Sequence, residues 1–284
     1  MTGEITTTYI MDVFKRMRRN PLVVISFLVF LLICWLILLA DYIAPYPYAY
    51  QAHTRVLEPP SRQHLMGTDH LGRDIFSRIL HGGRVSLKVG FVSLAGGALG
   101  GCLLGVMAGY FGGWLDLVIM RCVEILMAIP RTVLAISMAA TLGPGLTNTM
   151  LAVAISSVPA FARIARASTL SVKNQVYVEA ARALGATHPG IIVRHILPNI
   201  MAPIIVQATL GVGTAITLAA TLGFLGLGIE PPTPEWGAML AASRGFMRDH
   251  VHMVLFPGLA IMLTVITLNL IGDGLRDALD PKLK

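Results

Sequence analysis

The sequence predicts an all-α, polytopic membrane protein with six transmembrane helices. Of its 284 residues, 55% are hydrophobic and 13% are charged, with a mean hydropathy of +0.71. About a quarter of the residues of a soluble domain are charged. The apolar residues form blocks of about 20, long enough to cross a bilayer core of roughly 30 Å. The predicted spans are Leu22–Ala40, Ser86–Tyr110, Leu115–Leu142, Leu146–Ile164, Ile200–Leu227 and Val251–Ile271.

The first block is predicted to stay in the membrane as an anchor. Its apolar run exceeds the core of about 7–15 residues found in signal peptides, and no small-residue cleavage site follows it cleanly. An even number of spans places both termini on one side of the membrane. Lys15, Arg16, Arg18 and Arg19 precede the first span and indicate that this side is the cytoplasm.

The numbers of basic residues on the two sides favour this topology by a modest margin. Twelve Lys and Arg residues lie inside in this arrangement, eight lie outside, and two, Arg121 and Arg131, fall within the third span. The net charge of +7 is spread over four segments. A nucleic-acid-binding patch would gather these charges on one face, so no nucleic-acid partner is expected.

The sequence lacks the motifs of several kinds of chemical site. Cys34, Cys102 and Cys122 lie in apolar spans without disulfide or metal-site spacing. No Ser/His/Asp, Cys/His or paired-carboxylate arrangement stands out in the spans, so the chain is not expected to be an enzyme. It also lacks the phosphate-binding pattern G-x-x-x-x-G-K-[ST]. Energy for any transport would come from another chain or from an ion gradient.

The chain divides into an accessory part and a core. Residues 1–85 hold a cytoplasmic tail, the first transmembrane helix and a long outer loop. Residues 86–277 hold five spans and a polar insert at about 163–199, and residues 278–284 form a second cytoplasmic tail. The core is therefore predicted to be a five-helix unit.

Glycines recur every four residues along the second span. Lacking side chains, they let another backbone approach one helix face closely, so tight helix packing is favoured over a role in lining a pathway. These glycines are Gly97, Gly101, Gly105, Gly109 and Gly113, with Gly96 and Gly100 offset by one.

Prolines predict kinks in helices that are buried in protein, because neighbouring groups can satisfy the freed carbonyls there. They are Pro130, Pro159, Pro203 and Pro257. The fifth span closes with a glycine-rich run, residues 223–230, and then Pro231 and Pro232. This composition predicts that its outer end unwinds.

The polar insert predicts two short helices that are hinged at a glycine. Val176–Leu184 is good helix sequence, and Gly185 follows where a left-handed C-terminal cap is expected. Thr187 can cap a second short helix with Pro189 in its first turn. Glu179 can pair with Arg182 or with a basic group on a partner. The alternative interpretation is an ordinary loop whose alanines only favour helix.

The order of residues in this insert resembles the EAA loop of the membrane subunits of bacterial ABC importers. In that family a short coupling helix sits in a groove of the ATPase. The residues that carry the resemblance, and to which it assigns ATPase coupling, are Glu179, Ala180, Ala181, Arg182, Gly185 and Pro198.

Three further segments resemble the second, C-type permease of dipeptide, oligopeptide and nickel importers: residues 64–78, 231–240 and 272–281. The resemblance implies a MetI-like, type I importer permease fold with a cytoplasmic coupling helix in the bacterial inner membrane. It also implies a heterodimer with a paralogous permease, two ABC ATPases and a periplasmic solute-binding protein. The chain itself would need no cofactor, since ATP and magnesium would bind the ATPases.

Two charged sites in the third span have alternative interpretations. Arg131 follows Pro130 near mid-membrane, where a charge faces protein or a wet cavity. It could meet the carboxylate of a passing peptide, or it could form a structural pair or reach the membrane surface. Arg121 and Glu124 are spaced to pair with each other and are assigned to packing.

The outer segments offer two weaker candidates. His250 and His252 could bind a metal, but no carboxylate or thiol cluster accompanies them, so no metal site is expected. Residues 74–80 have the pattern of a helix on the membrane surface, either a structural shoulder or a contact for the binding protein.

The favoured function is an ATP-driven peptide importer permease. The first alternative is a nickel or metal-chelate importer of the same family. The second is an ion-driven secondary transporter, which would be expected to have inverted repeats and mid-membrane acids. The acid Glu124 lies within a predicted span but away from its centre, which disfavours that alternative.

Overall fold

The computed structural model describes residues 15–279, whose regular elements are helices. A single isolated β-bridge joins Thr68 and Asp74. The long helices are α2 (Pro21–Leu38), α4 (Ile75–Phe111), α5 (Gly113–Ala128), α6 (Arg131–Leu142), α7 (Leu146–Val172), α10 (Leu197–Phe224) and α12 (His252–Leu279). The shorter ones are α3 (Ala40–Ile43), α8 (Val176–Ala183), α9 (His188–Ile191), the π-helix η1 (Ile192–Ile196), α11 (Trp236–Ser243) and the 3-10 turn η2 (Arg244–Phe246).

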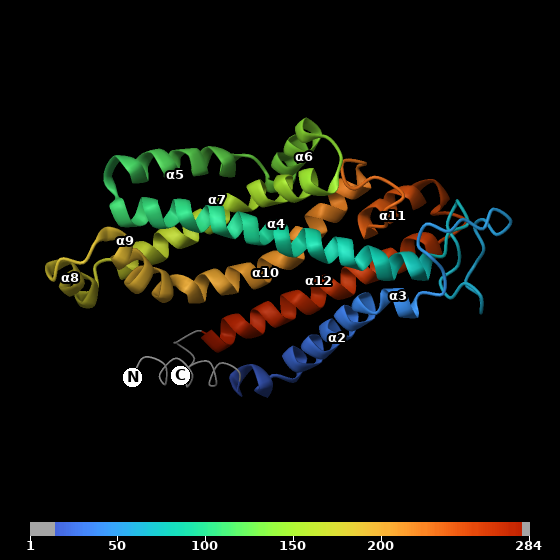
Figure 1. Ribbon diagram of the computed structural model, residues 1–284, viewed down its shortest axis with the longest axis horizontal. Helices are drawn as coiled ribbons and strands as arrows, with labels where there is room; N and C mark the ends of the chain where they lie inside the picture. The colour runs from blue at the N-terminus through green and yellow to red at the C-terminus, as the bar shows by residue number, and fades with distance from the viewer. Residues whose placement is uncertain (1–14, 280–284) are drawn as a thin grey trace.

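The all-helical membrane fold predicted from the sequence is confirmed. Five helical segments of the described chain are long and apolar enough to cross a membrane, and the bent pair α5–α6 makes six if it counts as one span. The start of α2, the end of α12 and the short helix α8 lie at the same end of the bundle, here called the α8 end (Figure 1). Residues 44–74 and 225–251 lie at the opposite end, here called the loop end.

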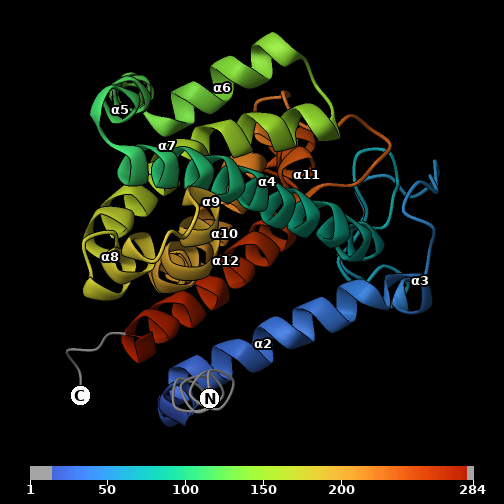
Figure 2. The same cartoon turned by 60° about the vertical axis from the view of Figure 1, so that its left-hand side comes forward.

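The bundle is built in layers around α4, α7 and α10. Helix α4 packs along α7, and α10 contacts α12, α4 and α7. Helices α5 and α6 cover one side of this group, and α2 lies on the other side against α12 (Figure 2). The main hydrophobic core joins α4, α7 and α10 through residues such as Val89, Phe161 and Ile216.

The glycines of α4 lie where this helix meets α7. A Cβ atom at Gly101 would come within 2.5 Å of the Val158 carbonyl oxygen, and one at Gly105 within 2.3 Å of the Ala162 oxygen. At Gly97 and Gly109 the corresponding contacts, 2.7 and 2.9 Å, are again to carbonyl oxygens of α7. Gly113 differs, because it begins α5 with nothing within 4 Å.

Helix α4 begins eleven residues before the predicted second span. Asp74 caps it by accepting a hydrogen bond from the Ser77 amide at 2.8 Å, and the other carboxylate oxygen contacts the His64 imidazole at 2.9 Å. Residues 75–80 are the first turns of α4, and Ile75, Ile79 and Leu80 are buried there. The segment is therefore the buried start of a long helix and not the predicted helix lying on the membrane surface.

The predicted third span is two helices and not one kinked helix. Helices α5 and α6 meet at a bend of 93° beside Pro130, which is the N-cap of α6. Proline cannot donate the hydrogen bond that would continue α5, which permits this break. The other three prolines, Pro159, Pro203 and Pro257, lie inside α7, α10 and α12.

Other span boundaries also differ from the prediction. Helix α7 continues to Val172, eight residues beyond Ile164, and α12 continues to Leu279, eight beyond Ile271. Polar side chains interrupt the apolar pattern in both extensions without interrupting the helix. Helix α10 ends at Phe224, and the following glycine-rich residues leave the helix as predicted.

Candidate functional site

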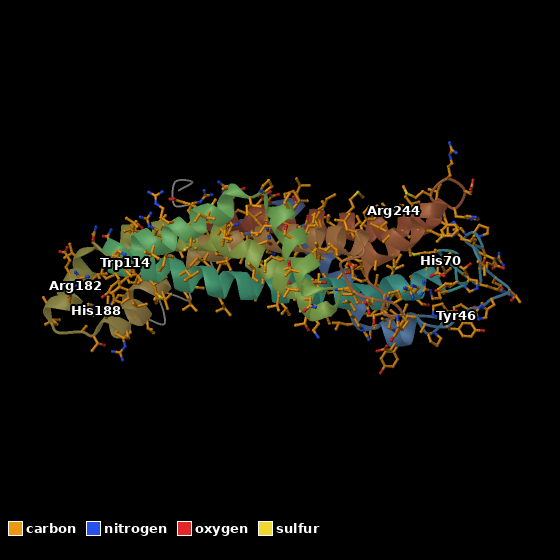
Figure 3. The ribbon with its side chains drawn as sticks, turned by 90° about the horizontal axis from the view of Figure 1, so that it is seen from above. Tyr46, His70, Trp114, Arg182, His188 and Arg244 are labelled. Atoms are coloured by element: carbon orange, nitrogen blue, oxygen red, sulfur yellow. The ribbon has the colours of Figure 1, made fainter. Side chains whose placement is uncertain are left out.

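The insert projects at one end of the molecule. Arg182 and His188 lie there, whereas Tyr46, His70 and Arg244 lie at the opposite end (Figure 3). Within α8, Val178 is fully buried in the main core. The other residues of α8 are exposed or partly exposed. One buried valine therefore anchors a helix that presents its remaining surface outward.

The end of α8 has the hydrogen bonds of a Schellman motif. The Ala186 amide donates to the Ala181 carbonyl at 3.1 Å, and the Gly185 amide donates to the Arg182 carbonyl at 3.0 Å. Gly185 has a φ of +80°, in the left-handed region that favours glycine. The geometry thus has the left-handed glycine that the sequence predicts at this position.

The segment after Gly185 differs from the predicted second short helix. The Thr187 hydroxyl accepts a hydrogen bond from the Gly190 amide and caps α9, as predicted. However, α9 runs on through η1 into α10, and residues 188–224 form one helical segment of 37 residues. Pro198 lies in the first turn of α10 and has no N–H to donate to the preceding turn. The π-helical widening of η1 lies directly before this proline.

Polar contacts join the insert to the ends of neighbouring helices. The Tyr110 hydroxyl lies 2.9 Å from His188 Nδ1, and Lys173 Nζ donates to the Gly109 carbonyl at 2.8 Å. Arg166 on α7 makes a bidentate ion pair with Asp116 on α5. These contacts therefore tie the insert to α4, α5 and α7.

The outer surface of the insert is apolar and basic. Val176 is 80% exposed and Leu184 is 88% exposed. The basic side chains of Arg182 and Arg194 are exposed beside them. Glu179 is exposed and forms no ion pair with Arg182, so the local pairing that was predicted is not present. Exposed large apolar side chains beside charges are typical of a protein-binding surface.

Arg131 faces a cavity of about 440 Å³ between α6, α10 and α12. Its guanidinium donates to the Ser157 hydroxyl at 2.8 Å and to the Thr214 hydroxyl at 3.2 Å. No acidic partner lies within ion-pair distance of it among the described residues. Of the alternatives for Arg131, the structural ion pair is therefore not present.

The other charged candidates are explained locally. Arg121 donates to Glu124 at 2.8 Å, as predicted for a packing pair on α5. His252 Nε2 lies 3.4 Å from the Thr68 carbonyl, and its ring meets that of His250 edge to face. In residues 15–279 no group of three or more His, Cys, Asp or Glu side chains could hold a metal.

Sequence reasoning missed Glu235, a buried acid at the loop end. Its carboxylate caps α11 by accepting from the amides of Gly237 and Ala238 at 2.9 and 2.8 Å, and from the Ser86 hydroxyl of α4 at 3.1 Å. A Cβ atom at Gly223 would lie 2.6 Å from Glu235 Oε2. Glu235 therefore ties α11 to both α4 and α10. Only its place before the short run 236–243 could have signalled this role.

Burial raises the pKa of Glu235 above its ordinary value, because an ionised carboxylate is poorly solvated there. A raised pKa in the folded state means that the carboxyl stabilises the fold most when it is protonated. This contribution to stability is lost as the pH rises from the pKa of Glu235 in the unfolded chain through its raised pKa in the folded protein. We expect the wild type to lose thermal stability relative to Glu235→Gln as the pH rises through this window. Melting of the detergent-solubilised protein measures the difference, and parallel pH profiles would contradict it.

Comparison with protein families gives two matches along the chain. The family described as "Binding-protein-dependent transport system inner membrane component" matches residues 101–284. The family described as "N-terminal TM domain of oligopeptide transport permease C" matches residues 8–60. Together the matches include the first membrane helix and the chain from the last part of α4 onward, which carries the insert.

Curated relatives resemble the chain over nearly its whole length. The dipeptide transport system permease protein DppC of Alkalihalophilus pseudofirmus is 47% identical over 273 residues, covering 96% of this chain and 90% of that protein. The glutathione transport system permease protein GsiD of Escherichia coli O157:H7 is 48% identical over 274 residues, with coverage of 96% and 90%. The same protein of Pectobacterium atrosepticum is 47% identical, with coverage of 96% and 91%.

Solved structures share the fold at lower identity. The inward-facing MetNI methionine ABC transporter aligns with a TM-score of 0.59 at 21% identity, covering 71% of this chain and 96% of that one. A chain of an amino acid ABC transporter aligns with a TM-score of 0.53 at 19% identity, with coverage of 69% and 91%. The fold predicted from the resemblance is confirmed by these alignments.

Proposed function

Because the chain belongs to the family of binding-protein-dependent transport system inner membrane components, we propose that it is the permease through which a bacterial ABC importer carries short peptides. The family assigns it to the membrane part of such a transporter. The relatives described above are named for dipeptide and glutathione transport, and both cargoes are short peptides with free carboxylates. Short peptides are proposed as the cargo because relatives that are 47–48% identical to this chain carry these names.

The surface formed by α8 and Gly185 is proposed to dock the ATPases. It combines a buried anchor at Val178 with exposed apolar groups and arginines, which suits a groove on a soluble partner. The contacts of His188, Lys173 and Arg166 would pass a push on this surface into α4, α5 and α7. The residues proposed to carry coupling are Glu179, Ala180, Ala181, Arg182, Gly185 and Pro198.

The proposed function implies a set of partner subunits and an orientation in the membrane. A paralogous permease would complete the pathway as a heterodimer, two ATPases would bind ATP and magnesium, and a periplasmic binding protein would deliver the cargo. The α8 end would face the cytoplasm of the bacterial inner membrane, together with both chain termini. Lys15, Arg16, Arg18 and Arg19 before α2 support that orientation.

Reconstitution of the full complex in proteoliposomes tests this function. With ATP and magnesium inside and the loaded binding protein outside, we expect labelled dipeptide or glutathione to accumulate, and a non-hydrolysable ATP analogue to prevent it. A pH gradient imposed without ATP should not drive uptake. Uptake of labelled nickel without peptide uptake would favour a metal-chelate importer. Failure of the chain to co-purify with any ATPase would contradict the proposed coupling.

A further inference from the structure

The cavity beside Arg131 is open to the surface of this chain and has a polar wall. Among the described residues that line it, Arg131 alone is charged. Thr214, Thr217 and Thr221 of α10 line it at intervals of three and four residues, which places them along one helix face. Asn269 of α12 completes the polar lining. Such a wall is costly against lipid tails, so it fits a face that meets polar cargo or water.

Arg131 keeps hydrogen-bonding capacity that the described residues do not use. A guanidinium has five N–H donors, and the contacts to Ser157 and Thr214 use two of them. Its Nε is buried without a hydrogen-bond partner. A charge near mid-membrane costs about 2.5–3.5 kcal/mol on insertion scales, so an unpaired one is a mark of function. The group that best completes a guanidinium is a carboxylate, which it can bind through two parallel hydrogen bonds.

The threonines offer the complementary chemistry. The hydroxyls of Thr214, Thr217 and Thr221 donate to the carbonyls of Gly211, Gly213 and Thr217, at 2.8, 2.9 and 2.8 Å. Their donors are thus occupied, and their oxygens keep lone pairs that accept from an N–H group. The cavity therefore presents cationic donors at Arg131 and acceptors along α10.

We propose that this cavity is a subsite of the transport pathway that binds the C-terminal carboxylate of the cargo at Arg131 and its amide N–H groups along the threonines. Helix α6 begins at Arg131 without a side-chain cap, so its N-terminal dipole also favours an anion there. The inference rests on the proposed function. It assigns to Arg131 the distinction between peptides with a free C-terminal carboxylate and peptides whose C-terminus is neutral.

Uptake of a dipeptide and of its C-terminal amide tests the subsite in the reconstituted complex. Each rate is divided by the occupancy of the binding protein with the same peptide, so that selection by that protein cancels. We expect wild type to prefer the free acid, and Arg131→Met to lower the acid-to-amide ratio about tenfold. Arg131→Lys, which keeps the charge but not the planar fork, should give an intermediate ratio. Arg121→Met is the matched control, because Arg121 lies on exposed α5 and pairs with Glu124, and it should keep the wild-type ratio.

The outcomes separate the subsite from the proposed function. Equal normalised uptake of acid and amide by wild type, or an unchanged ratio in Arg131→Met, would overturn the subsite while leaving a peptide importer. Loss of the second permease from purified Arg131→Met would show that Arg131 serves the subunit interface instead. No uptake of either peptide by wild type would overturn the proposed function, and the subsite with it. Removing a buried charge should ease membrane insertion, so the Met variant is expected to be produced.

Discussion

Replacing Gly185 with valine is expected to abolish ATP-driven uptake while leaving membrane insertion intact. The φ of +80° at this position is strongly unfavourable for a β-branched residue, at roughly 1–2 kcal/mol or more. Nothing lies within 4 Å of a Cβ atom there, so the strain is confined to the backbone. The chain can relieve it only by changing the path between α8 and α9. We expect uptake to fall more than tenfold, together with the ATPase stimulation caused by loaded binding protein.

The matched control for this change is Gly143→Val. Gly143 also has a φ of +80° and nothing within 4 Å, but it follows α6, in the turn that leads into α7. Gly143 has a ψ of 170°, and this combination with a positive φ is essentially restricted to glycine, so Gly143→Val carries at least as much backbone strain. The Gly185 variant alone should nevertheless uncouple the ATPase. Glu179→Lys reverses an exposed charge of α8 without backbone strain and is also expected to abolish transport. Wild-type uptake in Gly185→Val or Glu179→Lys would count against the coupling role of this surface.

The turn at Gly185 could be predicted because its signal is local. A helix-forming run, a glycine and a threonine cap occupy adjacent positions, and each has its own backbone preference. The glycine face of α4 was predictable for the same reason, since spacing by four fixes one face of a helix. Both features depend on neighbouring residues alone.

Features set by packing between distant segments could not be predicted in this way. Pro130 indicates a break, but the 93° turn there depends on how α5 and α6 pack against the bundle. The early start of α4 depends on Asp74 and His64, which are ten residues apart and buried under the outer loop. Glu235 joins Ser86 across 149 residues of sequence, and no periodic pattern carries that information.

Gly105→Ala is expected to destabilise the protein by about 1–3 kcal/mol or more, the usual range for overpacking a tight contact. The new methyl carbon would lie 2.3 Å from the Ala162 carbonyl oxygen and 2.8 Å from the Ala165 methyl. Both neighbours belong to the adjacent helix α7, and one of them is backbone. Relief therefore requires α4 and α7 to separate. Thermal unfolding in detergent measures the loss, and Gly105→Leu should give little folded protein.

Gly100→Ala separates this close approach from the general effect of glycine in a helix. A Cβ atom at Gly100 would lie 3.5 Å from Val158 Cγ2, an ordinary contact, so the helices need not move. The substitution also removes backbone freedom from the unfolded chain and should stabilise the protein by about 0.4–1 kcal/mol. The same chemical change, five residues apart on one helix, is thus expected to have opposite signs. Equal effects of the two substitutions would mean that close contact with α7 does not determine which glycines α4 requires.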